Sequence, residues 1–488
     1  MKQILLTSTI LLFAIITARA QFSGQNLAEA QYGKLPSDEG DYFFTMYNRG
    51  VFNYTTEKFR ASTTLELFQS PHRVRNYVNL TQASLNYRNK GFEFTAGNFY
   101  ETIGHGTLLR SFQIPGAILE DISYRSRHFF HRDMLGLNGK YSYNNLTVKM
   151  LYGQMLSNSY PPTEDRKVRR EDEVELAYID YKIKKQTIGI SGMRLHQREG
   201  EALYYGMGNL SGKLFPSLSY YAEVAKKLSN STLGDFTEDA SYAIYLNLNY
   251  YFERGGVSLE YKNYNQFLLG AGINEPPALV KEHTYRQLNR STHVLQPLNE
   301  QGYQVEAFLS LNNGNMLTLN NTMAINNFGK KYVFWESFAE YAGTIKETFD
   351  YKLFIDHAQD PFKLEQNRLS TGLYTEWNVG TKHIVDINYE YQHFERSSGS
   401  IYNHFLLLGY DYSSKFGISI IGELSNDPFL TTASSKTWLG TNIKYQINPK
   451  HKLQLFVGQR RGGPACSAGV CYEVPDFNGI ELRLSSRL

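Results

Sequence analysis

The sequence predicts an all-β fold, a single large transmembrane antiparallel β-barrel of about 24 strands, and three observations support this prediction. First, long segments alternate apolar and polar residues with a period of two. Second, these segments come in pairs that are joined by short turns and separated by longer polar connections. Third, the 488 residues include 37 Tyr, 30 Phe and 3 Trp, although the mean hydropathy is only −0.42. In a barrel only every second strand residue meets lipid, so an average over both faces hides the membrane-facing half.

Composition and charge exclude other classes of protein. The chain has 50 Lys and Arg against 47 Asp and Glu, and its aromatic content is high, which argues against a disordered chain. It has no basic block, so nucleic acid is not an expected partner. Beyond the first twenty residues, no stretch offers the roughly 18 apolar residues that a membrane-spanning helix needs.

The first twenty residues have the order of a secretory signal peptide. Lys2 precedes an apolar run over 4–16, and small residues occupy positions −3 and −1 of a cut after Ala20. We therefore expect residues 1–20 to be a signal peptide and residues 21–488 to form a β-barrel in the cell outer membrane, with outer-membrane lipid around it.

Residues 241–252 show the strand pattern clearly. Leu246 and Leu248 fall on an apolar face, and Asn247 and Asn249 fall on the opposite face. Strands of about eleven residues at roughly 3.3 Å each, tilted by roughly 40°, rise to about 28 Å, close to the apolar band of an outer-membrane barrel. Soluble sandwiches, the structural alternative, usually have strands of about five or six residues.

Parity predicts an even strand number, between about 22 and 26. If both chain ends lie in the periplasm, the short turns lie at the periplasmic rim as well. Residues 22–32 must then form a strand that precedes the strand at 42–53. The stretch 100–133 must then be one long connection or contain an even number of strands.

A barrel of this size encloses a wide lumen that has to be filled. The longest connections are expected at 100–133, 268–302 and 461–477. The first two are richer in apolar residues than a free surface loop, with Leu108 and Leu109 in the first. Because long ordered loops are usually functional, we expect long loops to fold in and partly fill the lumen.

The segment 96–111 (AGNFYETIGHGTLLRS) resembles the segment that marks an uncharacterised, porin-like family of exported Bacteroidota outer-membrane β-barrel proteins, known only as a domain of unknown function. In that family an aromatic strand end precedes a Gly-x-Gly turn and an apolar-apolar-Arg step. The stretches 274–306 and 462–488 are similar to it as well, so the resemblance covers nearly the whole mature chain. The chain departs from the family pattern at His105 and Leu488. The resemblance implies the fold and the compartment, but no activity.

Few residues suggest chemistry. His128 and His131 have a spacing that would put two metal ligands on one helical face, but no acidic or Cys partner is near, so a structural role is favoured and no metal site is predicted. Cys466 and Cys471 are the two cysteines, and in an exported turn they are expected to form a disulfide, with metal binding or a redox pair as the alternatives. No catalytic residue and no cofactor is predicted, since the known catalytic and phosphate-binding motifs are absent from the sequence.

His105 stands between two glycines, which favours a tight turn into the lumen over an anion-binding nest. We treat this turn and the nearby Arg110 as a candidate constriction segment, which comprises Gly104, His105, Gly106 and Arg110.

The alternation assigns interleaved acidic and basic residues to the lumen. These expected lumen-lining residues are Glu260, Lys262, Glu306, Asp350, Lys352, Asp356, Glu376, Asp386, Glu390, Lys444, Glu481, Arg483 and Arg487. They could pair across strands and brace the wall. Alternatively, they could line a polar conduit in which charge placement sets selectivity.

Two functions remain open from the sequence. The first is a porin-like channel for a small hydrophilic solute, gated or narrowed by in-folded loops. The second is a non-conducting outer-membrane receptor or scaffold that binds a surface lipoprotein or a secretion-associated partner protein. A barrel enzyme is not expected, because no nucleophile with a base and an orienting group is found.

Overall fold

The computed structural model describes residues 21–34, 41–121, 125–156, 169–196, 200–228, 240–270, 272–312, 314–467 and 470–488. The predicted signal peptide, residues 1–20, lies outside the described residues. Among the described residues, no helix has the length and apolar character needed to cross a bilayer.

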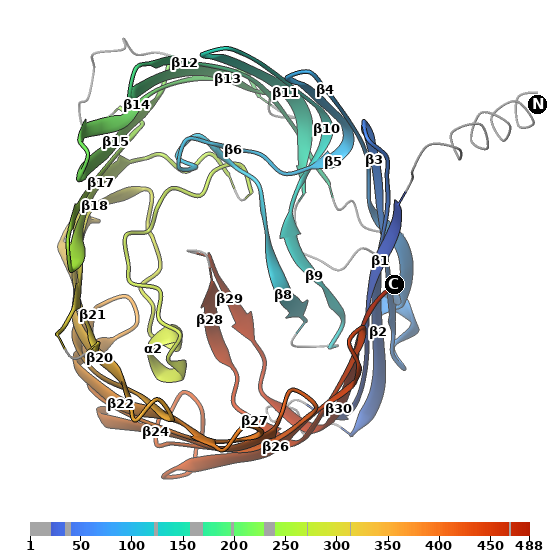
Figure 1. The fold of residues 1–488 in the computed structure, drawn as a ribbon, viewed down its shortest axis with the longest axis vertical. Coiled ribbons are helices and arrows are strands. Elements are labelled where there is room, and N and C mark those ends of the chain that lie inside the picture. The colour runs from blue at the N-terminus through green and yellow to red at the C-terminus, as the bar shows by residue number, and fades with distance from the viewer. Residues whose placement is uncertain are drawn as a thin grey trace, which may run out of the picture.

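Twenty-four antiparallel strands form one closed ring (Figure 1). Pairing of the first strand with the last closes it, with Gln25 opposite Arg487 and Gly33 opposite Gly479. The wall strands are β1 (Gln21–Lys34), β2 (Phe43–Thr55), β3 (Phe59–Gln69), β4 (Tyr77–Asn89), β5 (Phe92–Phe99), β10 (Met134–Tyr143), β11 (Leu146–Leu156), β12 (Arg169–Ile183), β13 (Gln186–His196), β14 (Leu203–Phe215), β15 (Leu218–Lys227), β16 (Tyr242–Phe252), β17 (Gly255–Asn265), β18 (Asn299–Ser310), β19 (Met316–Asn327), β20 (Lys331–Ile345), β21 (Phe349–Asp360), β22 (Glu365–Val379), β23 (His383–Arg396), β24 (Gly399–Tyr412), β25 (Phe416–Ser425), β26 (Lys436–Asn448), β27 (His451–Arg460) and β30 (Phe477–Arg487). The predicted fold class and strand number are confirmed.

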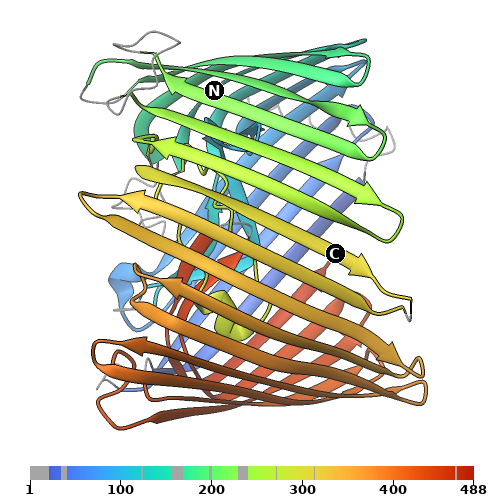
Figure 2. The same ribbon diagram turned by 90° about the vertical axis from the view of Figure 1, so that its left-hand side faces the viewer.

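The two rims of the barrel differ. The start of β1 and the end of β30 lie at one rim, which also carries short turns such as 90–91, 184–185 and 449–450. We call it the short-turn rim and the opposite one the long-loop rim. Figure 2 shows the strong tilt of the strands between them.

The expected alternation in connection length does not hold everywhere. Between β19 and β24 the long-loop rim has connections as short as 328–330 and 397–398. In this part of the wall the strands themselves are long, with 15 residues each in β20 and β22. Chain length that elsewhere forms loops is used here to extend the wall.

The outer surface of the barrel is apolar. In β16, Leu246 and Leu248 are about 40% exposed, whereas Tyr245 is only 3% exposed and faces the interior. β21 repeats the pattern, with Leu353 and Ile355 outside and Phe354 inside. An apolar outer band over a polar interior is typical of membrane-spanning barrels.

Three connections from the long-loop rim fold into the barrel (Figure 1). The first, 100–133, contains two small hairpins and so preserves the strand phase, as the parity argument required. The second runs over 266–298 rather than 268–302, because β18 begins at Asn299. The third is 461–476. Their elements are β6 (Thr102–Ile103), β7 (Leu109–Arg110), β8 (Phe112–Glu120), β9 (Arg127–Arg132), α2 (Arg286–Arg290), β28 (Gly463–Ser467) and β29 (Val470–Val474), while a short helix, η2 (Arg73–Arg75), lies in the connection between β3 and β4.

Part of the lumen is packed like the core of a soluble protein. Ile103, Leu108 and Leu109 of the first connection and Phe267 and Ile273 of the second are fully buried in one apolar cluster. The cluster includes inward-facing residues of β10–β17 near the long-loop rim. Burial of each such side chain is worth about 1.5–3 kcal/mol, so these segments form a stably docked layer against the wall.

Candidate functional site

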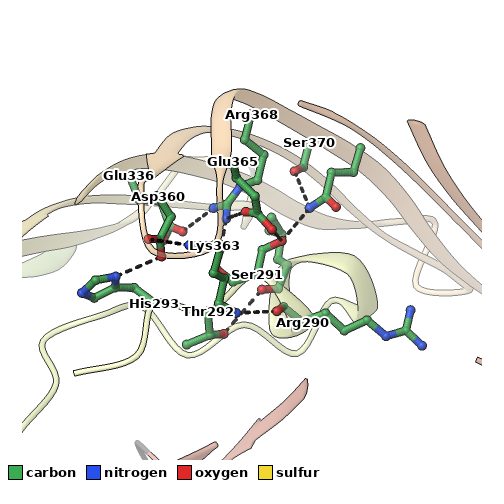
Figure 3. A network of polar contacts seen from close by, with 12 residues as sticks. Arg290, Ser291, Thr292, His293, Glu336, Asp360, Lys363, Glu365, Arg368 and Ser370 are labelled. Atoms are coloured by element: carbon green, nitrogen blue, oxygen red, sulfur yellow. Dashed lines mark hydrogen bonds and ion pairs between the residues drawn. The ribbon is translucent and has the colours of Figure 1, made fainter. Parts of the chain in front are cut away.

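A buried arginine fastens the second connection to the wall (Figure 3). Arg368 on β22 contacts three carboxylates, with Nη2 2.7 Å from Glu336, Nη1 2.9 Å from Glu365 and Nε 3.0 Å from Asp356. Its Nη1 also donates to the backbone carbonyl of Ser291 at 3.1 Å. A fully buried guanidinium needs this number of partners, because an unpaired buried charge is costly.

Two histidines of the second connection reach wall carboxylates. His283 Nε2 lies 2.9 Å from Glu336 Oε1, and His293 Nδ1 lies 3.0 Å from Asp360 Oδ2. Burial lowers the pKa of His293, but hydrogen bonds to Asp360 and Glu300 outweigh this effect, so its pKa is raised above the ordinary value.

Helix α2 is held by two further wall carboxylates. Glu390 on β23 accepts hydrogen bonds from the backbone N–H groups of Arg286 and Gln287, at 2.7 and 2.8 Å. Glu423 on β25 accepts from Arg286 Nε at 2.7 Å and also pairs with Arg290. Burial lowers the pKa of the Arg286 guanidinium, and Glu423 opposes that shift.

The third connection is joined to the second. Cys466 and Cys471 form a disulfide across β28 and β29, so the predicted bond is present. Asn289 of α2 donates to the carbonyl of Cys466 at 2.8 Å and accepts from its N–H at 2.9 Å. The two connections therefore dock as one unit.

A second ion-pair network holds the first connection to the seam between β1 and β30. Arg127 of β9 pairs with Glu29 of the wall and with Glu120 of β8. Arg125 lies 3.2 Å from Glu120. Burial, partly offset by Arg125 and Arg460, raises the pKa of Glu120 to about 7, and burial lowers the pKa of Arg127 to about 9.

The candidate constriction segment is packed rather than free in the lumen. His105 donates its backbone N–H to Glu223 at 3.0 Å, and its ring lies 4.2 Å from that of Tyr221. Gly104 and Gly106 have φ values of +61° and +90°, as a tight turn requires. The backbone N–H of Arg110 donates to Ile273 at 2.9 Å, and burial lowers the pKa of its guanidinium. The segment thus forms a contact between the first and second connections.

His128 and His131 do not lie on one face of a helix, the placement that their spacing suggested. Both residues lie in β9, where positions three apart point to opposite faces. The aromatic run between them packs instead, with Phe130 in an apolar cluster with Phe112 and Val470.

The expected lumen-lining residues divide into two groups. Residues of the first group contact the in-folded connections or neighbouring residues of the wall. Lys262 pairs with Glu300, Glu306 lies 2.5 Å from Lys281, and Asp356 and Glu390 hold the second connection as described above. Glu260 accepts from Tyr245 at 2.9 Å, Glu481 lies 3.3 Å from Arg460, and Arg483 lies 2.7 Å from Glu29.

The second group lies toward the short-turn rim, where three of the acidic residues come together. Asp350, Glu376 and Asp386 stand directly opposite one another on β21, β22 and β23. With Lys352 they line a cavity of about 460 Å³. Lys444 on β26 interacts electrostatically with Asp386, whereas Arg487 lies on β30 among the basic lining residues of another cavity.

One group of residues has the geometry of a metal site. The ligand atoms of His283, Glu336 and Asp356 lie within 4.8 Å of one another. Both carboxylates already bind the guanidinium of Arg368, which supplies the positive charge a metal ion would bring. This arrangement suits an anchor better than a metal centre.

The site residues expected from the sequence do not include Arg368, Glu336, Glu423 or the two histidines of the second connection. The sequence does contain a signal for Arg368. β21 and β22 form a tight hairpin around 361–364, and Asp356 and Arg368 are diagonal neighbours on its inward face, so their ion pair could have been expected. No comparable signal exists for Glu423, whose partners lie 133 and 137 residues away in sequence.

A family described as "Family of unknown function (DUF6029)" matches residues 1–362. The chain belongs to this family. The comparison with curated proteins found no similar sequence.

The comparison with solved structures found several that are similar to this family member. A chain of the E. coli P pilus tip assembly intermediate PapC-PapD-PapK-PapG is 8% identical, with a TM-score of 0.55, and the match covers 96% of this chain and 60% of that chain. A BenF-like porin from Pseudomonas fluorescens Pf-5 is 10% identical, with a TM-score of 0.40 and coverage of 70% and 94%. The ferric enterobactin receptor PfeA from Pseudomonas aeruginosa is 10% identical, with a TM-score of 0.49 and coverage of 96% and 81%. The present chain thus spans 60% of the length of the first of these.

Proposed function

We propose that the protein is an outer-membrane channel for a small hydrophilic solute, narrowed on its long-loop side by the three in-folded connections. The observation that carries the proposal is the contrast between the two halves of the lumen. Connections fill and bind the wall in one half, whereas charged wall residues line cavities in the other. If the connections served only to fill the lumen, the other half of the barrel would not need charged residues that line cavities.

The orientation follows from the usual design of such barrels. Bacterial outer-membrane barrels have short periplasmic turns and longer extracellular loops. We therefore place both chain ends and the short-turn rim in the periplasm. A solute from outside would meet the docked connections first and the charged half second.

Charge placement would set selectivity. Asp350, Glu376 and Asp386 face one another across adjacent strands, and like charges in that position are destabilising. These three carboxylates destabilise the wall, but together they produce an electrostatic field that attracts cations and repels anions on that side of the lumen. Charged side chains lining a pore are a known basis of ion selectivity.

Conductance in planar bilayers tests the proposal. Asn265 and Asn299 are paired at the ends of β17 and β18, so a short Gly-Ser linker can replace 268–296 without breaking the wall. We expect this replacement to raise the single-channel conductance. As a control, the exposed connection 71–75 at the same rim is replaced in the same way, and conductance should stay unchanged.

A barrel that remains closed after replacement of 268–296, although it folds as judged by heat-modifiable migration on gels, would contradict the channel. Recovery of a surface lipoprotein or secretion component after gentle detergent extraction of such a closed barrel would favour the receptor or scaffold instead.

A further inference from the structure

We infer that the barrel contains a binding site for a compact soluble polyanion, a molecule with two or more phosphate or carboxylate groups, at the short-turn rim. The site is a cavity of about 880 Å³ between the wall and the β8–β9 hairpin. Its wall side is formed by β1, β2, β26, β27 and β30 and the turns 413–415 and 449–450. Its inner side is formed by Gly116, Ile118 and Phe129.

The charge of the cavity is one-sided. Among the described residues that line it, none is Asp or Glu, whereas six are basic. These basic residues are Arg49, Lys415, Lys450, Lys452, Arg483 and Arg487. Arg483 is neutralised by Glu29 and Glu481 just outside the cavity.

The other five basic residues form no ion pair within the part of the chain that the structure describes. The Nε atom of Arg49 is buried and has no hydrogen-bond partner among these residues. Its guanidinium lies 3.7 Å from the centroid of the Phe129 ring, which fixes its position, and the buried Glu66 stands opposite Arg49 on the neighbouring strand β3. Lys415, Lys450, Lys452 and Arg487 are then four like charges around one cavity that repel each other, and a bound anion would relieve that repulsion.

The strand register brings these groups onto one surface. Lys452 stands opposite Ser485, Ser485 opposite Leu27, and Leu27 opposite Arg49, so the four form one row across β27, β30, β1 and β2. With strands about 4.8 Å apart, the ends of the row are roughly 14 Å apart. Lysine and arginine side chains at that separation can reach a small ligand held between them, with the Ser485 hydroxyl as a further donor.

The shape and chemistry of the cavity define the ligand class. A volume of about 880 Å³ lies within the usual range for small-molecule sites. Guanidinium and ammonium groups are the preferred partners of phosphate and carboxylate groups. Phe129 is the one aromatic lining residue and already contacts Arg49, so the cavity offers little surface for stacking a base. A compact polyanion therefore fits better than a nucleotide.

Isothermal titration calorimetry on the full-length barrel in non-ionic detergent tests the site, with inorganic pyrophosphate and citrate as separate probes. We expect at least one probe to bind at low salt and binding to weaken as sodium chloride is raised, because salt screens these charges. The double variant K452Q/R487Q should bind at least tenfold more weakly. The double variant K185Q/K213Q also removes two positive charges, from the turn 184–185 and from β14, outside the cavity, and should bind as the wild type does.

Heat-modifiable migration on gels establishes that each variant has folded. Failure of the wild type to bind either probe would overturn the inference, and so would unchanged binding by the folded K452Q/R487Q variant. Equal weakening by K185Q/K213Q would also overturn it, since the effect would then reflect overall charge. Binding is measured without conduction, so a barrel that binds but does not conduct would refute the proposed channel and leave this site in place.

Discussion

Substitution of Glu423 by Gln should release the docked connections from the wall while leaving the barrel intact. Glu423 is buried on β25 and contacts Arg286 and Arg290 of the second connection. It also lies 4.0 Å from Arg461 of the third. Gln keeps the size of the side chain but removes the charge, so three guanidinium groups lose their shared counter-charge. No strand hydrogen bond is altered.

The expected magnitude follows from these contacts. Removing one partner of a buried ion pair costs about 3–5 kcal/mol. At about 1.4 kcal/mol per factor of ten, the ratio of docked to released connections falls by a factor of roughly 150 to 5,000. In planar bilayers this should appear as more frequent openings to a larger conductance.

Limited proteolysis of the same variant should cut within 266–298, whereas in the wild type we expect docking to protect this segment. The matched control is Glu376→Gln on β22, which lines a cavity and has no contact with the connections among the described residues. It should leave the frequency of openings unchanged. Single-channel records and proteolysis patterns of Glu423→Gln that match those of the wild type would refute the anchoring role.

Two further predictions concern pH and the lipid-facing surface. His293 has a raised pKa, so its protonated form stabilises docking fully below about pH 6.5, the unfolded value, and this contribution is lost as pH rises through the raised pKa. Openings should therefore become more frequent toward alkaline pH, and His293→Gln should show no such dependence in the same bilayer assay. Leu408→Arg, at an exposed position in the middle of β24, should destabilise the barrel by about 2–4 kcal/mol in a urea unfolding titration in lipid. Leu407→Arg, at the adjacent inward position, should cost much less, and equal costs would contradict the assignment of the two faces.

The alternating pattern was sufficient to predict the wall, because the apolar residues within each strand indicate which of its faces meets lipid. Leu246 and Leu248 face outward and Tyr245 inward, as the period of two requires. Strand parity then fixed the even number of strands and the even content of 100–133, since both ends of a chain that closes on itself must meet at one rim.

The interior could not be predicted in the same way, because its contacts join residues that only three-dimensional closure brings together. Glu423 and Arg290 are 133 residues apart, and Arg483 and Glu29 are 454 apart. The sequence shows that Lys262 faces the lumen, but its partner Glu300 follows from the register of β17 and β18. The grouping of Asp350, Glu376 and Asp386 on adjacent strands likewise follows from the strand register.

The two halves of the lumen are therefore expected to respond differently to substitution. Changes in the apolar cluster around Leu108 and Ile273 act on the stability of the docked layer, because these residues are buried in the apolar cluster that joins the connections to the wall. Changes at Asp386 or Lys452 act on the field that a solute meets, because these residues line cavities and hold no connection in place. Different residues then set the access of the solute and the selectivity of the lumen. A substitution that alters both must lie where the two halves meet, and Glu306 has such a position because it contacts Lys281 of the second connection.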